Sequence, residues 1–279
     1  MKYKALFIDL DGTLLCKFKK ISRENLQALE KYYLGGGSIV LSTGRSPLNT
    51  FKIVDKIESN TKVKIRYVSC FNGAIVYDLE QKKPLFDSKI SVDVAKAIYQ
   101  YALQNKLGFW PYNKRYTDKK IIDILNTNYA FVIKLFYQKQ NSVNTKVIND
   151  LFDDIYKINI IPSHLFKKHT EEIYNKMKDA FGLNLNLCFT NKHIIEITNL
   201  NVNKGTSLKF IANLLNLKKD EIASIGDSFN DVPMFQESAI SALARVKNIK
   251  LVKDATFIMN KKNNKKSVAK FINNYLLES

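Results

Sequence analysis

An uninterrupted apolar run, Ala5-Leu6-Phe7-Ile8, constrains the fold of this chain more than any other segment. Such a run is typical of a strand that is buried on both faces, as inside a parallel α/β sheet. It leads directly into Asp9-Leu10-Asp11-Gly12-Thr13, so both acids are expected just beyond the carboxyl end of the strand. In open α/β sheets ligands bind at that edge. Asp9 and Asp11 can therefore face one site and share one metal ion and one phosphoryl group.

Three later segments carry further polar groups in similar positions. Ser38-Ile39-Val40-Leu41 leads into Ser42-Thr43-Gly44-Arg45, and a second apolar run leads into Gly226-Asp227-Ser228-Phe229-Asn230-Asp231. Between them, Lys204-Gly205 precedes a helical pattern. Each segment alone is typical of an ordinary turn or surface position. In this order they combine a nucleophile, a hydroxyl and a cation for phosphate oxygens, and carboxylates for a hard metal ion.

The length of 279 residues exceeds the usual size of a single core, so two domains are expected. The pattern of strands followed by polar motifs covers residues 1–83 and returns in residues 199–279. Residues 84–198 instead alternate strand-like and helical stretches. The strand-like stretches are 131–136 and 194–197, and the helical ones are 92–104 and 168–181. We interpret residues 84–198 as an inserted α+β domain with its own core.

The cysteines and the hydropathy pattern indicate the compartment. Cys16, Cys70 and Cys188 are scattered and form no Cys-x-x-Cys pair, which argues against a disulfide framework and against structural zinc. No apolar run reaches the roughly 18–20 residues of a membrane span. The strand expected at the N-terminus leaves no room for a signal peptide. We therefore expect a cytoplasmic protein without a membrane partner.

The formal net charge of +18 allows two interpretations. A basic protein can bind nucleic acid or attract anionic substrates. Alternatively, the richness in Lys, Asn, Ile and Tyr reflects an AT-rich genome. Because no nucleic-acid module accompanies the charge, we favour the compositional interpretation and expect no specific nucleic-acid binding. The densest run is expected to be a solvated loop before the final helix, and its lysines are Lys261, Lys262, Lys265 and Lys266.

Taken together, these motifs resemble a haloacid dehalogenase-superfamily phosphatase of the Cof-type branch, which has a large α/β cap. The resemblance extends over nearly the whole chain. Its motifs are Asp9-Leu10-Asp11-Gly12-Thr13-Leu14, Ser42-Thr43-Gly44-Arg45, Phe71-Asn72-Gly73-Ala74, Lys204-Gly205, and Gly226-Asp227-Ser228-Phe229-Asn230-Asp231 with Met234. It implies an α/β fold with a Rossmann-like core and a parallel sheet, formed by residues 1–83 and 199–279. Residues 84–198 would be the inserted cap, mobile over the active site.

The residue types predict a mechanism. Asp9 is the expected nucleophile, and Asp11 is expected to protonate the leaving oxygen and then to activate water. Asp9, Asp227 and the backbone carbonyl of Asp11 are the expected ligands of Mg²⁺, a hard ion that keeps several waters. Lys204 and the metal would neutralise the phosphate oxygens, to which Thr43 would donate a hydrogen bond.

Further contacts complete the expected site. The backbone amides of Leu10 and Gly44 are expected to donate to phosphate. The resemblance implies that Asn230 also contacts phosphate and that Asp231 supports the metal shell. Asn72 and Arg45 are expected at strand ends on the same face. Arg45 is expected to reach the substrate, to brace the cap or to form a structural ion pair, and these alternatives stay open.

Two stretches depart from the pattern of the family. Where the family carries a Gly-Asn-Ala turn, this chain has Ser241-Ala242-Leu243-Ala244-Arg245-Val246. Near the C-terminus, Ser267-Val268 replaces Gly-Val. Neither change removes an expected catalytic group. Both put in doubt the local turn geometry and any substrate contact made there.

Three functions fit these observations. The first is a Mg²⁺-dependent phosphatase that acts on small phosphorylated metabolites such as sugar phosphates, nucleotides or a cofactor phosphate. The second is a basic regulatory or nucleic-acid-binding protein that has kept the fold without turnover, and the third is a phosphomannomutase-like phosphotransferase. The presence of Asp9, Asp11, Lys204 and Asp227 together favours an enzyme. The fold does not determine the substrate, and the oligomeric state is not predicted.

Overall fold

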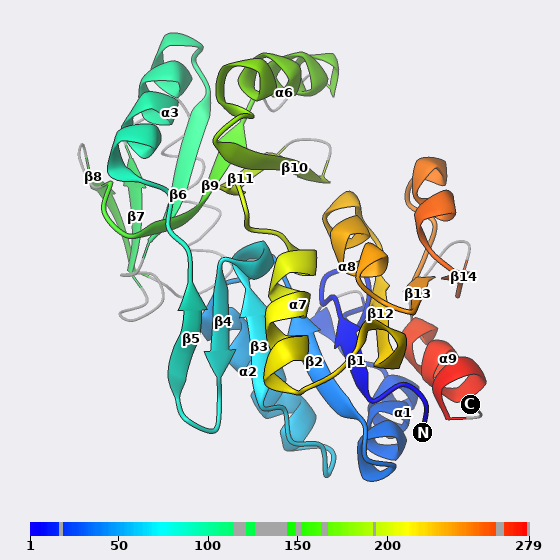
Figure 1. The fold of residues 1–279 in the computed structure, drawn as a ribbon. Coiled ribbons are helices and arrows are strands. Elements are labelled where there is room, and N and C mark those ends of the chain that lie inside the picture. The colour runs from blue at the N-terminus through cyan, green and yellow to red at the C-terminus, as the bar shows by residue number, and fades with distance from the viewer. Residues whose placement is uncertain are drawn as a thin grey trace. The chain divides into compact units, whose positions relative to one another are not determined.

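The computed structural model describes residues 1–16, 19–113, 121–125, 144–148, 152–162, 167–191, 194–260 and 265–277. The chain forms two compact units, one of Met1–Phe86 with Asn203–Ser279 and one of Asp87–Val202 (Figure 1). The strand expected at residues 131–136 lies outside the described residues. No helix in the described ranges has both the length and the hydropathy that crossing a membrane requires.

An eight-stranded sheet lies at the centre of the first unit (Figure 1). In spatial order its strands are β14 (Phe257–Ile258), β13 (Ile240–Leu243), β12 (Ile222–Gly226), β1 (Ala5–Ile8), β2 (Ser38–Ser42), β3 (Tyr67–Cys70), β4 (Ile75–Asp78) and β5 (Lys83–Asp87). From β14 to β3 neighbouring strands pair in parallel, whereas β3 and β4 pair antiparallel. The four residues of β1 are fully buried, which confirms the strand expected from its apolar run.

Helices pack against this sheet. They are α1 (Arg23–Leu34), α2 (Pro47–Glu58), α7 (Lys204–Leu214), α8 (Val232–Gln236) and α9 (Ser267–Phe271). Serine side chains cap α1 and α2, because Ser22 accepts a hydrogen bond from Asn25 N and Ser46 accepts one from Asn49 N. One core cluster joins Phe7 of β1 to side chains of α7 and α8. Both α7 and α8 begin beside the carboxyl ends of the strands, since the first residue of α7 contacts Asp9 after β1, and α8 follows the loop after β12.

The second unit is an α+β structure. Its four-stranded antiparallel sheet has the order β10 (Leu185–Asn191), β11 (Ile194–Asn199), β9 (Ile155–Ile161), β6 (Gly108–Asn113). Its helices are α3 (Val92–Gln104) and α6 (Lys167–Phe181), and β7 (Ile121–Leu125) pairs in parallel with β8 (Asn144–Ile148). These elements confirm the expected helices at 92–104 and 168–181 and the strand at 194–197.

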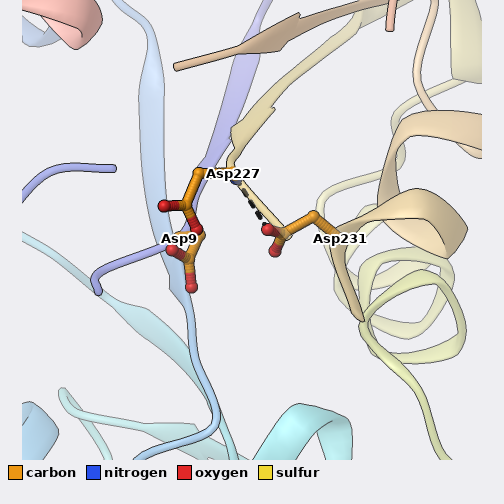
Figure 2. A group of neighbouring side chains, drawn as sticks. All are labelled: Asp9, Asp227 and Asp231. Carbon is orange, nitrogen blue, oxygen red and sulfur yellow. Dashed lines mark hydrogen bonds between the residues drawn. The ribbon is translucent and has the colours of Figure 1, made fainter. Parts of the chain in front are cut away.

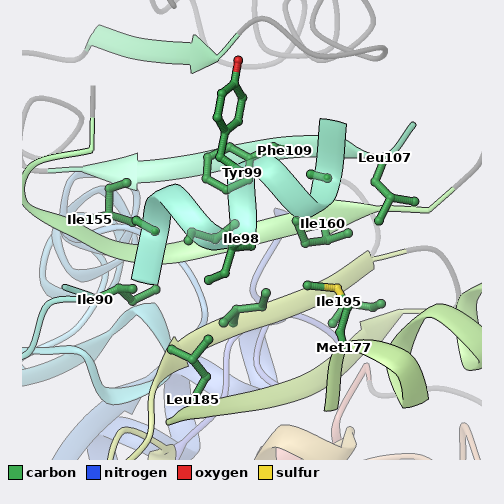
Figure 3. Close-up of a cluster of buried hydrophobic side chains, with 14 of the residues drawn as sticks. Ile90, Ile98, Tyr99, Leu107, Phe109, Ile155, Ile160, Met177, Leu185 and Ile195 are labelled. Atoms are coloured by element: carbon green, nitrogen blue, oxygen red, sulfur yellow. The ribbon is translucent and has the colours of Figure 1, made fainter. Parts of the chain in front are cut away.

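The second unit has a hydrophobic core of its own. Ile98 and Tyr99 of α3 pack with Phe109 of β6, and Met177 of α6 lies beside Ile195 of β11 (Figure 3). The ring centroids of Tyr99 and Phe109 are 5.4 Å apart in an edge-to-face arrangement. The fold is therefore the expected one, an α/β unit with a parallel sheet and an inserted α+β unit.

Candidate active site

Three buried carboxylates gather at the carboxyl edge of the parallel sheet (Figure 2). Asp9 follows β1 and Asp227 follows β12, and these strands are neighbours in register. Asp231 lies one turn beyond Asp227, directly before α8. One carboxylate oxygen of each acid lies within 4.8 Å of the others. Such a group of oxygen ligands suits a hard divalent cation.

Lys204 connects two of these acids. Its Nζ donates hydrogen bonds to Asp9 Oδ1 at 2.6 Å and to Asp231 Oδ1 at 2.7 Å, and its side chain is fully buried. The start of α7 places this lysine, because the Asn203 side chain caps the helix by accepting from the backbone N–H groups of Gly205 and Thr206. Asp9, Lys204 and Asp231, which are far apart along the chain, thus form one hydrogen-bonded network.

Asp231 closes the turn that carries Asp227. Its Oδ2 accepts hydrogen bonds from the backbone N–H groups of Asp227 and Ser228, at 2.8 and 2.9 Å. A Cβ at position 226 would lie 2.3 Å from Asp231 Cγ, so only glycine allows the carboxylate to reach under the strand end. Both oxygens of Asp231 are therefore engaged within the protein.

The electrostatic environments of Asp9 and Lys204 are unusual. Burial, together with the charges of Asp231 and Asp227, raises the pKa of Asp9 to about 8, although Lys204 opposes this shift. Burial acts to lower the pKa of Lys204, but Asp231 and Asp9 outweigh it and raise this pKa above its usual value. The lysine therefore stays cationic, and an additional positive charge beside Asp9 would favour its ionised form.

Asp11 lies outside this buried cluster. Its carboxylate accepts two hydrogen bonds from Arg45, from Nε to Oδ2 and from Nη2 to Oδ1, both at 2.6 Å. The Asp11 side chain is 59% exposed, whereas that of Arg45 is only 15% exposed. Partial desolvation acts to raise the pKa of Asp11, but the hydrogen bonds and charge of Arg45 outweigh it and lower this pKa. In the structure Arg45 forms an ion pair with Asp11, which is one of the three alternatives expected for it.

The Thr43 hydroxyl and the side-chain amides of Asn72 and Asn230 form a second group at the carboxyl edge of the parallel sheet. Thr43 is buried, its Oγ1 accepts from Arg45 N at 3.2 Å, and its carbonyl accepts from Asn72 N at 2.9 Å. Asn72 and Asn230 contact each other, with Asn230 Nδ2 donating to Asn72 Oδ1 at 3.1 Å. Gly44 lies against Asn72, since a Cβ at Gly44 would be 3.0 Å from Asn72 Oδ1. The motifs after β2, β3 and β12 thus meet at one place.

The turn that carries Asn72 has an unusual backbone. Phe71, Asn72 and Gly73 have φ values of 50°, 58° and 104°, all in the left-handed region. A left-handed phenylalanine is uncommon and costs free energy, and such strain is concentrated at functional sites. Phe71 is fully buried, and the backbone N–H groups of Phe71 and Asn72 donate to the carbonyls of Arg45 and Thr43, both at 2.9 Å.

Two cationic residues near Asp227 were missed by the sequence analysis. Arg245 Nε lies 3.0 Å from Asp227 Oδ2, and Lys247 Nζ lies 2.6 Å from the same oxygen. Ser228 Oγ donates to Asp227 Oδ1 at 2.8 Å. The only signal in the sequence was the departure from the Gly-Asn-Ala turn, which put in doubt the turn geometry and any substrate contact made there.

The other departure contacts the first. Ser267 is fully buried and its Oγ donates to the carbonyl of Ala244 at 2.6 Å, while Ala244 N donates to Gly226 O at 2.8 Å. The altered turn is therefore attached to β12 on one side and to α9 on the other. The loop keeps a defined geometry without the glycine of the family pattern.

Comparison with known proteins identifies the family. A family model described as haloacid dehalogenase-like hydrolase matches residues 6–272. The chain belongs to this family, in its Cof-type branch. A candidate phosphatase of Mycoplasma pneumoniae is 35% identical over 241 residues, which cover 83% of each chain. The Bacillus subtilis 5-amino-6-(5-phospho-D-ribitylamino)uracil phosphatase YwtE is 26% identical, with 98% of each chain covered.

Solved structures agree with the fold of this haloacid dehalogenase-like hydrolase. A haloacid dehalogenase-like hydrolase from B. subtilis superimposes with a TM-score of 0.80 at 23% identity, covering 98% of this chain and all of the other. TM0651 from Thermotoga maritima gives a TM-score of 0.76 at 24% identity, covering 98% and 97%. Because the matches span both units, the inserted unit is part of the shared fold.

Proposed function

We propose that this protein is a Mg²⁺-dependent phosphatase that hydrolyses small phosphorylated metabolites through a phosphorylated Asp9. The observation that carries the proposal is the buried network in which Lys204 bridges Asp9 and Asp231 beside Asp227. It combines a carboxylate nucleophile, a fixed cation and metal-ligating oxygens at the edge where α/β sheets bind ligands. The names of the relatives support a phosphatase.

The donor set fits a magnesium ion. Asp9 and Asp227 supply carboxylate oxygens, and the backbone carbonyl of Asp11 is the third protein ligand that we assign. Few protein ligands and several waters are typical of Mg²⁺. When bound, the ion supplies positive charge that stabilises the negative charge on the transferring phosphoryl group.

In the first half-reaction we assign Asp9 as the nucleophile. One carboxylate oxygen attacks phosphorus in line with the leaving oxygen, so that an Asp9–phosphorus bond forms while the bond from phosphorus to the leaving oxygen breaks. Protonated Asp11 gives its proton to that oxygen and becomes a carboxylate. Since Arg45 holds Asp11 in the ionised form, Asp11 must exchange this ion pair for a proton before it acts as an acid.

In the second half-reaction water hydrolyses the phosphorylated Asp9. Asp11, now a carboxylate, accepts a proton from the water as its oxygen attacks phosphorus, and the bond to Asp9 breaks. Inorganic phosphate and the free Asp9 carboxylate result, and Asp11 is protonated again. The ion pair with Arg45 favours the carboxylate that this half-reaction needs.

The remaining residues of the edge position the phosphate. We assign Lys204 and the Thr43 hydroxyl to its oxygens, together with the backbone amides of Leu10 and Gly44. We also assign Asn230 to phosphate. Its Oδ1 is buried without a hydrogen-bond partner in the described part of the chain, and its Nδ2 contacts Asn72. A phosphate oxygen needs a donor, and the Asn230 Nδ2 group has a second N–H besides the one it donates to Asn72.

The two units then have separate roles. We assign the unit of Met1–Phe86 with Asn203–Ser279 as the catalytic core and the unit of Asp87–Val202 as the cap that selects the substrate. The cap expected at residues 84–198 is thus shifted slightly along the chain, because β5 belongs to the central sheet. Sugar phosphates, nucleotides and cofactor phosphates are the candidate substrates. YwtE, a relative of similar length, is named for a phosphorylated ribityl compound, and this name supports a small phosphorylated metabolite as the substrate.

A phosphate-release assay over a panel of phosphorylated metabolites tests the proposal. We expect release with Mg²⁺, none with EDTA, and recovery when Mg²⁺ is added back. Asp9→Asn should abolish turnover, whereas Asp220→Asn, the same change at an exposed aspartate, should not affect it. Turnover that persists in EDTA would exclude the metal, and radiolabel trapped on another residue would exclude Asp9 as nucleophile. Transfer of the phosphoryl group to a second hydroxyl without release would instead indicate the phosphotransferase.

A further inference from the structure

The carboxylate of Asp227 is already saturated by side chains of this protein. Its Oδ1 accepts from Ser228 Oγ at 2.8 Å, and its Oδ2 contacts Arg245 Nε at 3.0 Å and Lys247 Nζ at 2.6 Å. The Asp227 side chain is 1% exposed, whereas those of Arg245 and Lys247 are 31% and 38% exposed. A buried acid is thus approached from the solvent side by two cations that can move away.

Gly12 makes room for this arrangement. A Cβ at Gly12 would lie 1.9 Å from Asp227 Oδ2 and 2.7 Å from Arg245 Nη2. The loop that carries Asp9 and Asp11 therefore packs directly on the contact between Asp227 and Arg245. The two cations lie inside the candidate site, against the same carboxylate oxygen that faces the acid loop.

The charges around Asp227 balance without a metal ion. Asp9, Asp227 and Asp231 would carry three negative charges if ionised, and the basic groups in direct contact with them are Lys204, Arg245 and Lys247. Outside the cluster, Asp11 and Arg45 balance each other. A divalent cation that enters this cluster meets no net negative charge unless a basic side chain leaves. The family pattern has an asparagine in this turn, which would not compete in this way.

We propose that Arg245 and Lys247 are counter-ions of Asp227 that compete with Mg²⁺ for its Oδ2, and that metal binding displaces them. The inference rests on the metal site of the proposed function. The turn that departs from the Gly-Asn-Ala pattern would then weaken metal binding by the free protein. None of the catalytic steps described above involves this turn. The carboxylate of Asp227 has a partner both without the metal and with it, so it is never buried as an uncompensated charge.

Calorimetric titration of the purified full-length protein with Mg²⁺ tests this inference without an activity readout. Arg245→Asn and Lys247→Asn should each lower the Mg²⁺ dissociation constant by about three- to tenfold, since a partly exposed ion pair is lost in each. Lys250→Asn is the matched control, because this exposed lysine lies in the next turn, Ile249–Asp254, and among the described residues forms no ion pair or hydrogen bond with Asp227. It should leave the constant within about twofold.

Thermal unfolding supplies the second measurement. Without Mg²⁺ both variants should have a lower Tm than wild type, and the rise in Tm on adding saturating Mg²⁺ should be larger in the variants. Because Lys247 is on the surface, its variant is expected to fold even where Arg245→Asn does not. Unchanged or weakened Mg²⁺ binding in Lys247→Asn would overturn the competition while leaving the metal site standing. A wild-type protein that binds no Mg²⁺ would overturn both.

Discussion

At the scale of single residues, the two acids of one short motif have opposite environments. Asp9 is buried and contacts Lys204, and its pKa is raised, whereas Asp11 faces solvent and Arg45, and its pKa is lowered. Two carboxyl groups whose environments separate their pKa values are suited to different roles in acid–base chemistry. The ion pair with Arg45 therefore determines when Asp11 can act as an acid.

Replacing Arg45 should change how the enzyme discriminates between leaving groups. Arg45 lowers the pKa of Asp11, so Arg45→Ala should raise it and keep Asp11 protonated to higher pH. The descending limb of kcat against pH should move to higher pH. At pH 7 the rate on an alkyl phosphate, relative to p-nitrophenyl phosphate, should rise about three- to tenfold, because only the poor leaving group needs the acid.

The matched control for this prediction is Arg66→Ala. Arg66 pairs with Asp78 and Glu80 in the same unit, so this change removes a similar ion pair away from Asp11. Its rate ratio and pH profile should resemble those of wild type. If Arg45→Ala instead raises KM equally for both substrates and leaves the pH profile unmoved, Arg45 binds substrate and does not control Asp11.

Single residues also show where sequence reasoning ends. Asp9, Lys204 and Asp227 were predictable, because each stands beside a recognisable strand or helix start. The contacts of Arg245 and Lys247 with Asp227 were not, since they depend on how a turn 18 residues further along the chain directs two long side chains. The left-handed turn at Phe71 was also unpredictable, because nothing in its local sequence requires that conformation.

At the scale of elements, the predicted helices with clear caps agree best with the structure. The helix expected at residues 92–104 is α3, which begins and ends at those residues. Ser91 caps its start and Asn105 follows its end. The pairing of β7 with β8 was not predicted, since two short strands far apart in sequence leave no local signal. Among the capped helices, α7 is the one whose first residue belongs to the candidate site.

Removing the cap of α7 should affect both stability and activity. Asn203→Ala deletes the side chain that accepts from Gly205 N and Thr206 N, both at 2.9 Å, and should cost about 1 kcal/mol in the free energy of unfolding. Because Lys204 is the first residue of this helix, fraying should also displace its Nζ from Asp9 and reduce kcat. Ser22→Ala removes the cap of α1 in the same unit and should cost about the same stability with kcat unchanged. Equal kcat in both variants would show that the cap does not position Lys204.

At the scale of the whole molecule, the net charge of +18 is the feature that the proposed function uses least. The acids and cations in contact at the candidate site balance one another, so the excess positive charge lies elsewhere on the chain. Within the densest run, Lys261 and Lys262 lie outside the described residues. Lys266 is described and pairs with Glu24 at 2.6 Å.

The compositional interpretation of this charge predicts weak, salt-sensitive binding of DNA and RNA. Affinity should fall steeply with salt as counterions are released, show no sequence preference, and vanish near 0.15 M salt, the approximate physiological value. Fluorescence anisotropy with unrelated oligonucleotides over a salt series measures this.

Two variants locate any binding site. In the first, the four lysines of the dense run, Lys261, Lys262, Lys265 and Lys266, are replaced by glutamine. In the control variant, four scattered exposed lysines are replaced by glutamine, namely Lys96, Lys178, Lys209 and Lys219. Both variants should flatten the salt dependence alike and keep phosphatase turnover, because drifted charge has no preferred position. Sub-micromolar, sequence-selective binding at about 0.15 M salt, lost only in the first variant, would instead make the dense run a nucleic-acid site.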